Sequence, residues 1–352
     1  MAYLAEREGA RTQFVSSIVH PISPFHDSRA LFDLARLVRE FRPHIVHTHT
    51  AKAGFLGRAA ALSLRPRPIV VHTYHGHVLE GYFGRGRSTV YGTLERSMAR
   101  VSDCLIGVSD ATVDDLVRLG VAARERFRVI RLGLDLAGFA QIDAGAGQAL
   151  RDEIGVRDGE VLLTFAGRLV PIKRVDRLLR AVSLARAEGA RVRLAIVGDG
   201  GMRSGLEDLA RDLGILKRVH FLGYRRDLAR IAAATDVAVV SSENEGTPVS
   251  LIEAAAAGCP AIATEVGGVA EVVTPETGIL VPPDDEAAFA DALGRLAGEH
   301  DLRRRMGGRA RERVLSRYSI DRLLADVDEL YADLISARDG GHRRPSRDAV
   351  SP

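Results

Sequence analysis

The chain has few of the residues that would cross-link it or place it in a membrane. Its 352 residues include only two cysteines, Cys104 and Cys259, and no tryptophan. Two distant cysteines argue against a disulfide framework or a cysteine-based zinc site, and they fit a reducing compartment. No apolar run approaches the roughly 20 residues of a spanning helix, and the first residues do not resemble a signal peptide. We therefore expect a cytoplasmic protein, with peripheral contact at the inner face of the membrane as a further option.

Lysine is also scarce, and the net charge of +3 is unevenly distributed. Residues 1–140 hold 19 Lys or Arg and 13 Asp or Glu, whereas the remainder holds 30 and 33. A basic first half favours anionic lipid or an anionic acceptor over nucleic acid, for which no binding motif is present. Only three of the 49 basic residues are lysines: Lys52, Lys173 and Lys217. Lys52 stands at an expected helix start, where the dipole disfavours a cation, which indicates an anionic ligand.

Apolar runs typical of buried strands alternate with helix-like periodic segments, a pattern typical of doubly wound α/β domains. In the first half we expect strands at 11–16, 44–49, 68–74, 104–108 and 128–130, and helices at 28–40, 53–64, 89–101 and 110–119. In the second half we expect strands at 161–166, 191–197, 219–221, 237–240, 261–264 and 278–281, and helices at 175–188, 201–213, 228–234, 248–257, 269–274 and 286–298.

These elements predict two domains. The first covers residues 1–140 and the second residues 141–316, with a Gly- and Ala-rich connection between them. Residues 337–352 are rich in Arg, Gly and Pro and have little to bury, so we expect a disordered tail.

The stretch Ser241–Pro260 is the most informative part of the chain, because it joins an expected buried strand to a helix. Thr247 suits an N-cap and Pro248 the first helical position. Gly258 suits the residue that ends the helix. A helix that starts at the carboxyl end of a parallel strand favours an anionic ligand.

Two carboxylates accompany that helix start. Glu245 falls in the loop before the helix, and Glu253 falls inside it. Carboxylates beside an anion site predict a ligand with both hydroxyl groups and phosphate, which describes a sugar nucleotide. In the alternative interpretation, Glu245 merely favours the helix dipole and Glu253 is solvated. The apolar neighbours of Glu253 argue against that.

Two cations follow the strand expected at 161–166. Gly167 permits a close backbone approach, and Arg168 and Lys173 come next. A planar guanidinium and an ammonium together suit the diphosphate of a leaving group. Solvated cations before a helix are the alternative, which the rarity of lysine makes less attractive.

Other turns at strand ends carry weaker signals. Gly198, Asp199 and Gly200 lack the spacing of a dinucleotide fingerprint, so a plain tight turn explains them equally well. Leu222 lies in a segment that offers backbone contacts to a nucleobase, or that is simply an edge of the core. The pair Gly267–Gly268 is expected beside the Glu245 loop, since consecutive strands usually neighbour one another.

Histidines gather at two strand ends in the first half. His47 and His49 share one face of a strand, and His75 and His77 follow the next strand. A metal site is the less favoured interpretation, because Glu80 is the only nearby carboxylate. Hydrogen bonds to a sugar hydroxyl or a carbonyl are favoured, and purely structural roles remain open for His47 and His77.

Together these motifs resemble the family 4, or group 1, glycosyltransferases. The resemblance covers about residues 6–334, and its most specific part is the pair of glutamates eight positions apart, Glu245 and Glu253. The following segments agree in order and spacing: Gly167-Arg168-Leu169 with Lys173, Gly198-Asp199-Gly200, and Arg131-Leu132-Gly133-Leu134-Asp135. Residues 47–54 and 73–76 match a bacterial polysaccharide-type branch.

The resemblance implies an α/β protein with the GT-B fold, two Rossmann-like, doubly wound parallel-sheet domains that face a cleft. The family usually begins with a strand and a Gly-rich loop before the segment that opens this sequence. The chain is therefore expected to be truncated at its N-terminus, with a first domain that lacks its first strand. The resemblance also implies a C-terminal helix over 317–336 that returns to the first domain.

The resemblance also implies a retaining, metal-independent transfer of a hexosyl or N-acetylhexosaminyl group from a UDP- or GDP-linked donor to a glycan or lipid-linked acceptor. No cofactor is implied beyond this co-substrate. Catalytic roles fall to His75, Arg168, Lys173 and Glu245. Donor contacts fall to Gly167, Gly198, Asp199, Gly200, Leu222, Gly246, Thr247, Pro248, Val249 and Glu253. Weaker acceptor-side assignments are His49, Lys52, Gly76 and His77.

Two alternatives stay open at the level of sequence. A sugar-nucleotide 2-epimerase would share the fold but would need acid and base carboxylates in the cleft. A non-catalytic partner subunit of a glycosyltransferase would fit the incomplete first domain.

Overall fold

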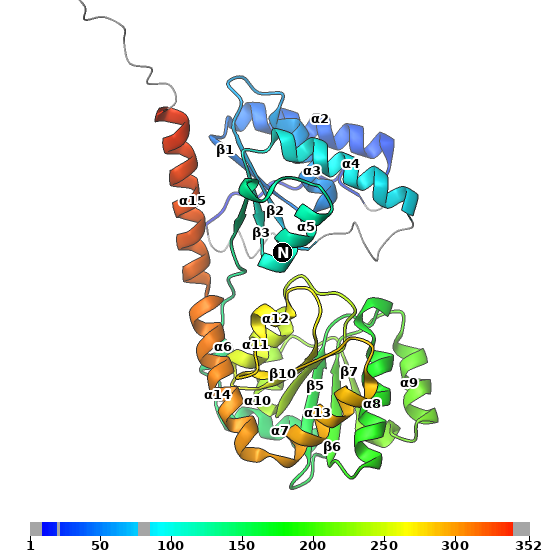
Figure 1. Cartoon of the computed structure of the whole chain (residues 1–352). Coiled ribbons are helices and arrows are strands. Elements are labelled where there is room, and N and C mark those ends of the chain that lie inside the picture. Colours follow the sequence, from blue (N-terminus) through cyan, green and yellow to red (C-terminus); the bar gives the residue numbers. More distant parts are fainter. Residues whose placement is uncertain (1–8, 20–21, 77–84, 341–352) are drawn as a thin grey trace, which may run out of the picture. The chain divides into compact units, whose positions relative to one another are not determined.

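The computed structural model describes residues 9–19, 22–76 and 85–340 (Figure 1). The chain divides into two compact units. Unit 1 comprises Met1–Val108, Thr112–Val129 and Val327–Pro352, and unit 2 comprises Ser109–Ala111 and Ile130–Asp326. Within the described residues, no helix combines the length and the hydropathy that crossing a membrane requires.

Unit 1 contains a parallel sheet of four described strands in the order β1-β2-β3-β4. The strands are β1 (Ile45–His49), β2 (Ile69–Tyr74), β3 (Cys104–Gly107) and β4 (Phe127–Val129). Its helices are α2 (Pro24–Phe41), α3 (Ala51–Ala61), α4 (Arg85–Val101), most of α5 (Asp110–Arg118) and the second part of α15 (Ile320–Gly340), with a 3-10 turn, η1 (Arg124–Arg126).

The strand predicted at 11–16 is wrong, because the described residues 9–19 contain turns and extended chain but no strand. A strand forms only where a neighbour completes its hydrogen-bond ladder. In the described part of the sheet, β1 pairs with β2 alone.

Unit 2 contains a six-stranded parallel sheet in the order β10-β9-β8-β5-β6-β7. The strands are β5 (Val161–Ala166), β6 (Val192–Val197), β7 (Val219–Gly223), β8 (Val237–Val240), β9 (Ala261–Thr264) and β10 (Gly278–Val281). The chain starts in the middle at β5, winds outward to β7, and returns beside β5 with β8. The strand order therefore reverses between β5 and β8, which in open α/β sheets is where ligands bind.

The helices of unit 2 connect these strands. They are α6 (Ala137–Ala140), α7 (Gln148–Glu153), α8 (Val175–Ala187), α9 (Arg203–Asp212), α10 (Leu228–Ala234), α11 (Val249–Ala256), α12 (Val269–Val272), α13 (Glu286–Gly298), α14 (His300–Arg317) and the start of α15. Short 3-10 turns are η2 (Ala144–Gly147), η3 (Pro171–Lys173) and η4 (Leu216–Arg218).

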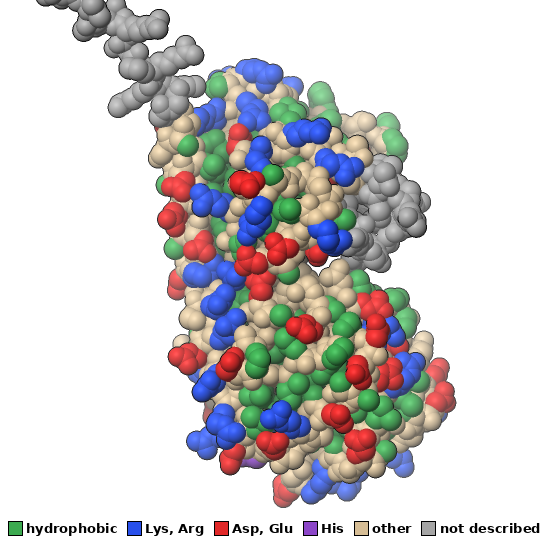
Figure 2. Space-filling view, in the orientation of Figure 1, with side chains coloured by type: hydrophobic (Ala, Val, Ile, Leu, Met, Phe, Trp, Pro, Cys, Tyr) green, Lys and Arg blue, Asp and Glu red, His purple; other side chains and the backbone are tan. Residues whose placement is uncertain are grey.

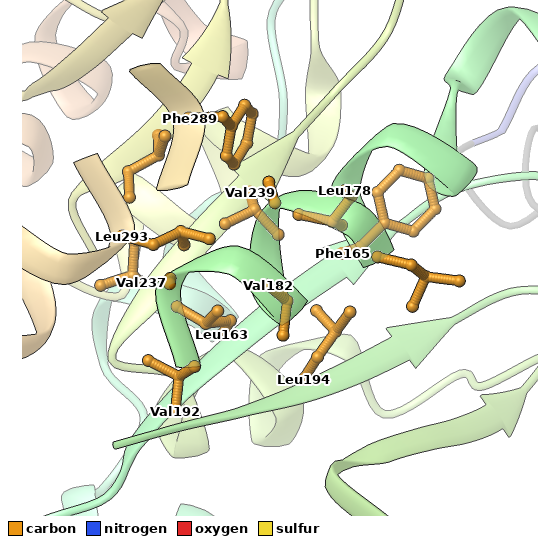
Figure 3. Close-up of a cluster of buried hydrophobic side chains, with 14 of the residues drawn as sticks. Leu163, Phe165, Leu178, Val182, Val192, Leu194, Val237, Val239, Phe289 and Leu293 are labelled. Atoms are coloured by element: carbon orange, nitrogen blue, oxygen red, sulfur yellow. The ribbon is translucent and has the colours of Figure 1, made fainter. Parts of the chain in front are cut away.

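The main core of unit 2 lies between the sheet and helices α8 and α13 (Figure 3). Alternate residues of each strand point to this face, such as Leu163 and Phe165 of β5. They meet Leu178 of α8 and Phe289 of α13. A second cluster on β5 and β6 packs against α7 and α10. Because both faces are buried, the strands read as continuous apolar runs, which explains why the sequence predicts them well.

The helix expected over 317–336 is α15, which begins at Ile320 and runs to Gly340. Helix α14 ends at Arg317, and Ser319 between the two helices forms a parallel bridge with Leu134. Because α15 continues to Gly340, the disordered tail predicted from residue 337 is wrong for residues 337–340. Residues 341–352 lie outside the described part.

Candidate active site

The loops after β5 and β8 lie at the point where the strand order reverses, and they carry the two charged residues that matter most. Nζ of Lys173, at the end of η3, lies 2.6 Å from Oε1 of Glu245. Both side chains are largely buried, with 23% and 12% of their surface exposed. The structure thus brings together residues 72 positions apart.

Two buried serines hold these loops in register. The Ser241 hydroxyl donates to the carbonyl of Lys173 at 2.9 Å, and the Ser242 hydroxyl donates to Oε1 of Glu245 at 2.6 Å. The Ser242 carbonyl accepts from the Thr264 hydroxyl. Neither serine was predicted as a site residue. The available signal was two small polar residues directly after a buried strand.

Glycine turns pack tightly around the same sheet edge. A Cβ on Gly198 would lie 2.0 Å from the carbonyl oxygen of Gly167, and one on Gly200 would lie 2.4 Å from that of Leu169. The φ angle of Gly198 is 126°, which also favours glycine. The two loops approach each other so closely that only glycine fits at these turns. This packing accounts for the glycines without a bound ligand.

The Gly267–Gly268 turn lies beside the Glu245 loop, as predicted. The amide of Gly268 donates to the carbonyl of Glu245 at 3.0 Å, and a Cβ on Gly268 would lie 1.9 Å from the carbonyl oxygen of Gly246. The backbone of Gly246 is therefore fixed from the next strand along the sheet.

The start of α11 differs from the prediction by one residue. Pro248 is the N-cap, with φ −77° and ψ 88°, and the helix begins at Val249. The Thr247 side chain therefore does not cap the helix, and its buried Oγ1 finds no hydrogen-bond partner in the described structure. A buried hydroxyl without a partner costs free energy. Gly258, with φ 89°, follows the C-cap Ala257 as predicted.

Glu253 lies on α11 beside a small pocket of about 30 Å³. The pocket wall is mostly apolar, with contributions from Ala166, Leu228 and Leu251 and a hydroxyl from Thr164. Burial raises the pKa of the Glu253 carboxyl above the usual range. The residue therefore pays a desolvation cost in the unliganded protein.

Three further predicted residues lie at the ends of β5, β6 and β7. Arg168 is exposed, and its guanidinium has no hydrogen bond or ion pair within the described residues. Asp199 is also exposed, and its Oδ1 accepts from the amide of Gly200 at 2.7 Å. Leu222 is half-buried and packs against the core cluster on β5 and β6.

Three histidines of unit 1, His47, His49 and His75, form a connected cluster at the ends of β1 and β2. Nδ1 of His49 lies 2.9 Å from Nε2 of His75, and the rings of His47 and His49 stack with centroids 4.5 Å apart. His47 hydrogen-bonds the hydroxyls of Tyr331 at 2.6 Å and Thr73 at 2.7 Å, so both of its ring nitrogens are satisfied. Burial lowers the pKa of His47 to about 4, with repulsion from His49 and His75 adding to the effect. His47 is thus neutral at physiological pH.

The other residues predicted on the acceptor side are Lys52, Gly76 and His77. Nζ of Lys52 lies 2.5 Å from Oδ1 of Asp27 and donates to the carbonyl of Val19. Asp27 supplies a negative charge beside Lys52, so a cation at this helix start does not require an anionic ligand. Gly76, with φ 134°, is exposed, and His77 lies outside the described residues. No group of three or more His, Cys, Asp or Glu side chains in the described structure is placed to hold a metal ion.

The comparisons with known proteins agree with the motifs. A family model described as glycosyl transferases group 1 matches residues 148–313, and one described as glycosyltransferase family 4 matches residues 4–137. D-inositol 3-phosphate glycosyltransferase of Saccharomonospora viridis is 35% identical over 315 residues, which cover 83% of this chain and 70% of that protein. The chain belongs to the group 1, family 4 glycosyltransferases.

Other relatives resemble this glycosyltransferase over most of their length. UDP-Gal:alpha-D-GlcNAc-diphosphoundecaprenol alpha-1,3-galactosyltransferase of Escherichia coli is 29% identical over 340 residues, or 93% of this chain and 85% of the relative.

Solved structures confirm the GT-B fold of the glycosyltransferase. The structure of Anabaena HepE in complex with UDP and glucose has a TM-score of 0.82 and is 21% identical in sequence. The matched part covers 94% of this chain and 89% of the HepE chain. Sucrose-phosphate synthase of Thermosynechococcus elongatus has a TM-score of 0.75 and is 26% identical in sequence. The matched part covers 90% of this chain and 81% of the synthase chain.

Proposed function

We propose that this glycosyltransferase moves a sugar from a nucleotide-sugar donor to a glycan or lipid-linked acceptor in cell-surface polysaccharide synthesis. The observation that carries the proposal is the contact between Lys173 and Glu245 where the strand order of unit 2 reverses. A cation and a carboxylate side by side suit a ligand that carries a phosphate next to a hydroxyl-rich ring. The buried, unpartnered Oγ1 of Thr247 adds a hydroxyl that a ligand would satisfy.

A UDP-linked donor is favoured over a GDP-linked one. The name of the E. coli relative includes UDP-Gal, and HepE was solved with UDP and glucose. In this assignment, Arg168 and Lys173 bind the diphosphate, Glu245 and the backbone of Gly246 to Val249 bind the transferred sugar, and Glu253 accepts from the ribose hydroxyls. The turns at Gly167, Gly198–Gly200 and Leu222 supply backbone contacts near the base and phosphates.

The chemistry is transfer with retention at the anomeric carbon and without a metal ion. The bond between that carbon and the phosphate oxygen breaks, and the charge developing on the phosphate is stabilised by the two cations. The acceptor hydroxyl attacks the same face, and its proton passes to the departing phosphate oxygen. A carboxylate nucleophile, as in retaining hydrolases, is not required. His75, held by His49, is assigned to the reacting face of the sugar.

The acceptor assignment rests on relatives. The E. coli relative is named for an acceptor linked to diphosphoundecaprenol, and the S. viridis relative for inositol 3-phosphate. A lipid-linked glycan at the inner face of the membrane fits the basic first half of the chain.

A donor panel tests this function. The purified chain is incubated with UDP- and GDP-sugars in the presence of a chelator, with and without lipid-linked acceptors, and free nucleotide is measured. We expect UDP release that the correct acceptor accelerates, and a product whose anomeric configuration matches that of the donor by NMR. An isomerised sugar nucleotide with no free UDP would show an epimerase instead, and no turnover of any donor would favour a partner subunit.

A further inference from the structure

Histidine is concentrated in one part of unit 1. Six of the 11 histidines of the chain fall between residues 44 and 77. Charged side chains are spread over the face of the molecule that Figure 2 shows, whereas little histidine is visible there. Three of the six, His47, His49 and His75, touch one another at the ends of β1 and β2. The proposed transfer gives a role to His75 alone, which leaves the other two rings without one.

The pairing of β1 with β2 explains why two of these rings meet. In the parallel register, His49 lies opposite Thr73. His75 comes two residues after Thr73, just beyond the end of β2, and residues two apart in an extended chain face the same side. Nδ1 of His49 lies 2.9 Å from Nε2 of His75, and the ring centroids are 5.2 Å apart. The contact therefore follows from the register of two paired strands.

His47 forms a fixed platform for the ring of His49. The hydroxyls of Tyr331 and Thr73 occupy both ring nitrogens of His47, so this ring cannot turn without losing a hydrogen bond. The His49 ring stacks on it with an angle of 26° between the two planes. His49 is therefore held through its face by His47 and through its edge by His75.

His49 and His75 are both neutral at physiological pH. Desolvation lowers the pKa of each imidazole, and repulsion from His75 lowers the pKa of His49 further. A neutral imidazole has one nitrogen that donates and one that accepts. Two neutral rings in contact thus share a single hydrogen, and the tautomer of one ring sets the tautomer of the other.

This coupling decides what His75 offers to a ligand. Within the described residues, Nδ1 of His75 has no hydrogen-bond partner, while its Nε2 is occupied by His49. Nδ1 is therefore the nitrogen left for the sugar, and the tautomer decides whether it donates or accepts there. The wrong tautomer would place a donor against a donor or an acceptor against an acceptor, which loses the hydrogen bond.

We infer that His49 is a positioning residue for His75: it fixes the ring and the tautomer that His75 presents to the transferred sugar. This inference rests on the proposed function, because His75 acts on the sugar only in that assignment. It replaces the weaker assignment of His49 to the acceptor side. A direct contact with the acceptor is disfavoured, since one face and one nitrogen of His49 are already used within unit 1.

Two amide substitutions at His49 distinguish its ring nitrogens. Asparagine places its amide near Nδ1 of the histidine and can donate or accept there, whereas glutamine places its amide near Nε2. We expect His49→Ala and His49→Gln to lower the maximal rate of nucleotide release by about tenfold or more. His49→Asn should stay within about threefold of the unaltered chain. His44→Ala, at an exposed histidine just before β1, is the control and should keep the full rate.

Leaving out the acceptor separates a positioning residue from an acceptor ligand. Slow hydrolysis of the donor requires His75 but no acceptor. His49→Ala should therefore slow hydrolysis and transfer by the same factor and leave the KM for the acceptor unaltered. Full hydrolysis with a raised acceptor KM would overturn the inference. A His49→Asn protein as slow as His49→Ala would overturn it as well.

Nitrogen NMR of the histidine rings tests the positioning without any turnover. His75 should show one tautomer in the unaltered chain and in His49→Asn, and a mixture in His49→Ala; a His75→Asn sample identifies its signals. The melting temperature should stay the same in each variant, since both side chains are exposed. A single His75 tautomer in His49→Ala would overturn the inference. If no protein released nucleotide while the NMR results held, the proposed function would fail and the control of His75 by His49 would stand.

Discussion

Lys173 and Glu245 touch each other through an ammonium–carboxylate contact of 2.6 Å. The residue assigned to the donor phosphates therefore positions the residue assigned to the transferred sugar. Lysine has three donor hydrogens, so one can remain on Glu245 while others reach phosphate oxygens. Ser242 donates to the same carboxylate oxygen, which further restricts Glu245.

Because the two residues share one contact, we expect their substitutions to be non-additive. Glu245→Gln and Lys173→Met should each lower the rate of nucleotide release at saturating donor by about 10²-fold or more. The double variant should lose about as much as the worse single variant, since residues that act as a unit give non-additive effects. Lys217→Met, which removes an exposed lysine, serves as the control and should keep full activity. Losses that multiply in the double variant would show that the residues act independently.

Arg168 should matter for turnover but not for stability. Its exposed guanidinium makes no contact that the folded state needs within the described residues. Arg168→Met is therefore expected to keep the melting temperature and to lose about 10²-fold in nucleotide release. Arg193 offers the opposite case, because it is 7% exposed and lies 2.7 Å from Glu160. Arg193→Met should destabilise unit 2 by about 1–3 kcal/mol, because the buried Glu160 loses one charged partner and keeps its contact with Arg218. A clear drop in melting temperature for Arg168→Met would contradict this assignment.

Glu253 should make the unliganded protein less stable as the pH rises. Its carboxyl pKa is raised by burial, so the folded state holds a proton that the unfolded state has already released. The free energy of unfolding therefore falls as the pH rises from the ordinary glutamate pKa through the raised one.

Glu253→Gln removes this cost. The variant should melt about 1–3 °C higher than the unaltered chain at neutral pH, with the difference vanishing under acidic conditions. Added UDP should raise its melting temperature less, since the ribose loses an acceptor. Glu188→Gln, at an exposed helix end, is the control and should change neither value. A Glu253→Gln protein that melts lower at neutral pH would contradict the prediction.

Gly54 should be irreplaceable, because α3 packs against a buried histidine. A Cβ at this position would lie 2.4 Å from Cε1 of His72, which is 1% exposed and hydrogen-bonded to Thr48. Gly54→Ala is expected to destabilise unit 1 by about 1–3 kcal/mol in urea unfolding followed by circular dichroism. Gly92 on α4 is the matched control, since a Cβ there would meet only Arg96 at 3.6 Å. Gly92→Ala should be neutral or stabilising by up to about 1 kcal/mol.

Prediction from sequence was most accurate where burial is continuous. Strands β5, β8, β9 and β10 have the expected bounds, because each is a short, mostly apolar run that ends at a polar residue, a glycine or a proline. It was wrong at residues 11–16, a short segment with no described neighbour to pair with. It was also one residue off at Pro248, because a proline suits both the N-cap and the first helical position and only the backbone angles distinguish them.

Local spacing alone was sufficient to predict two α/β domains, the alternation of strands and helices, and the family, since these depend on periodicity and on motifs of a few residues. It could not reveal the Lys173–Glu245 contact, the serines that hold it, or the neutralisation of Lys52 by Asp27. Each of these joins segments that are distant in the chain, and they meet only because the strand order brings particular loops to one edge of a sheet.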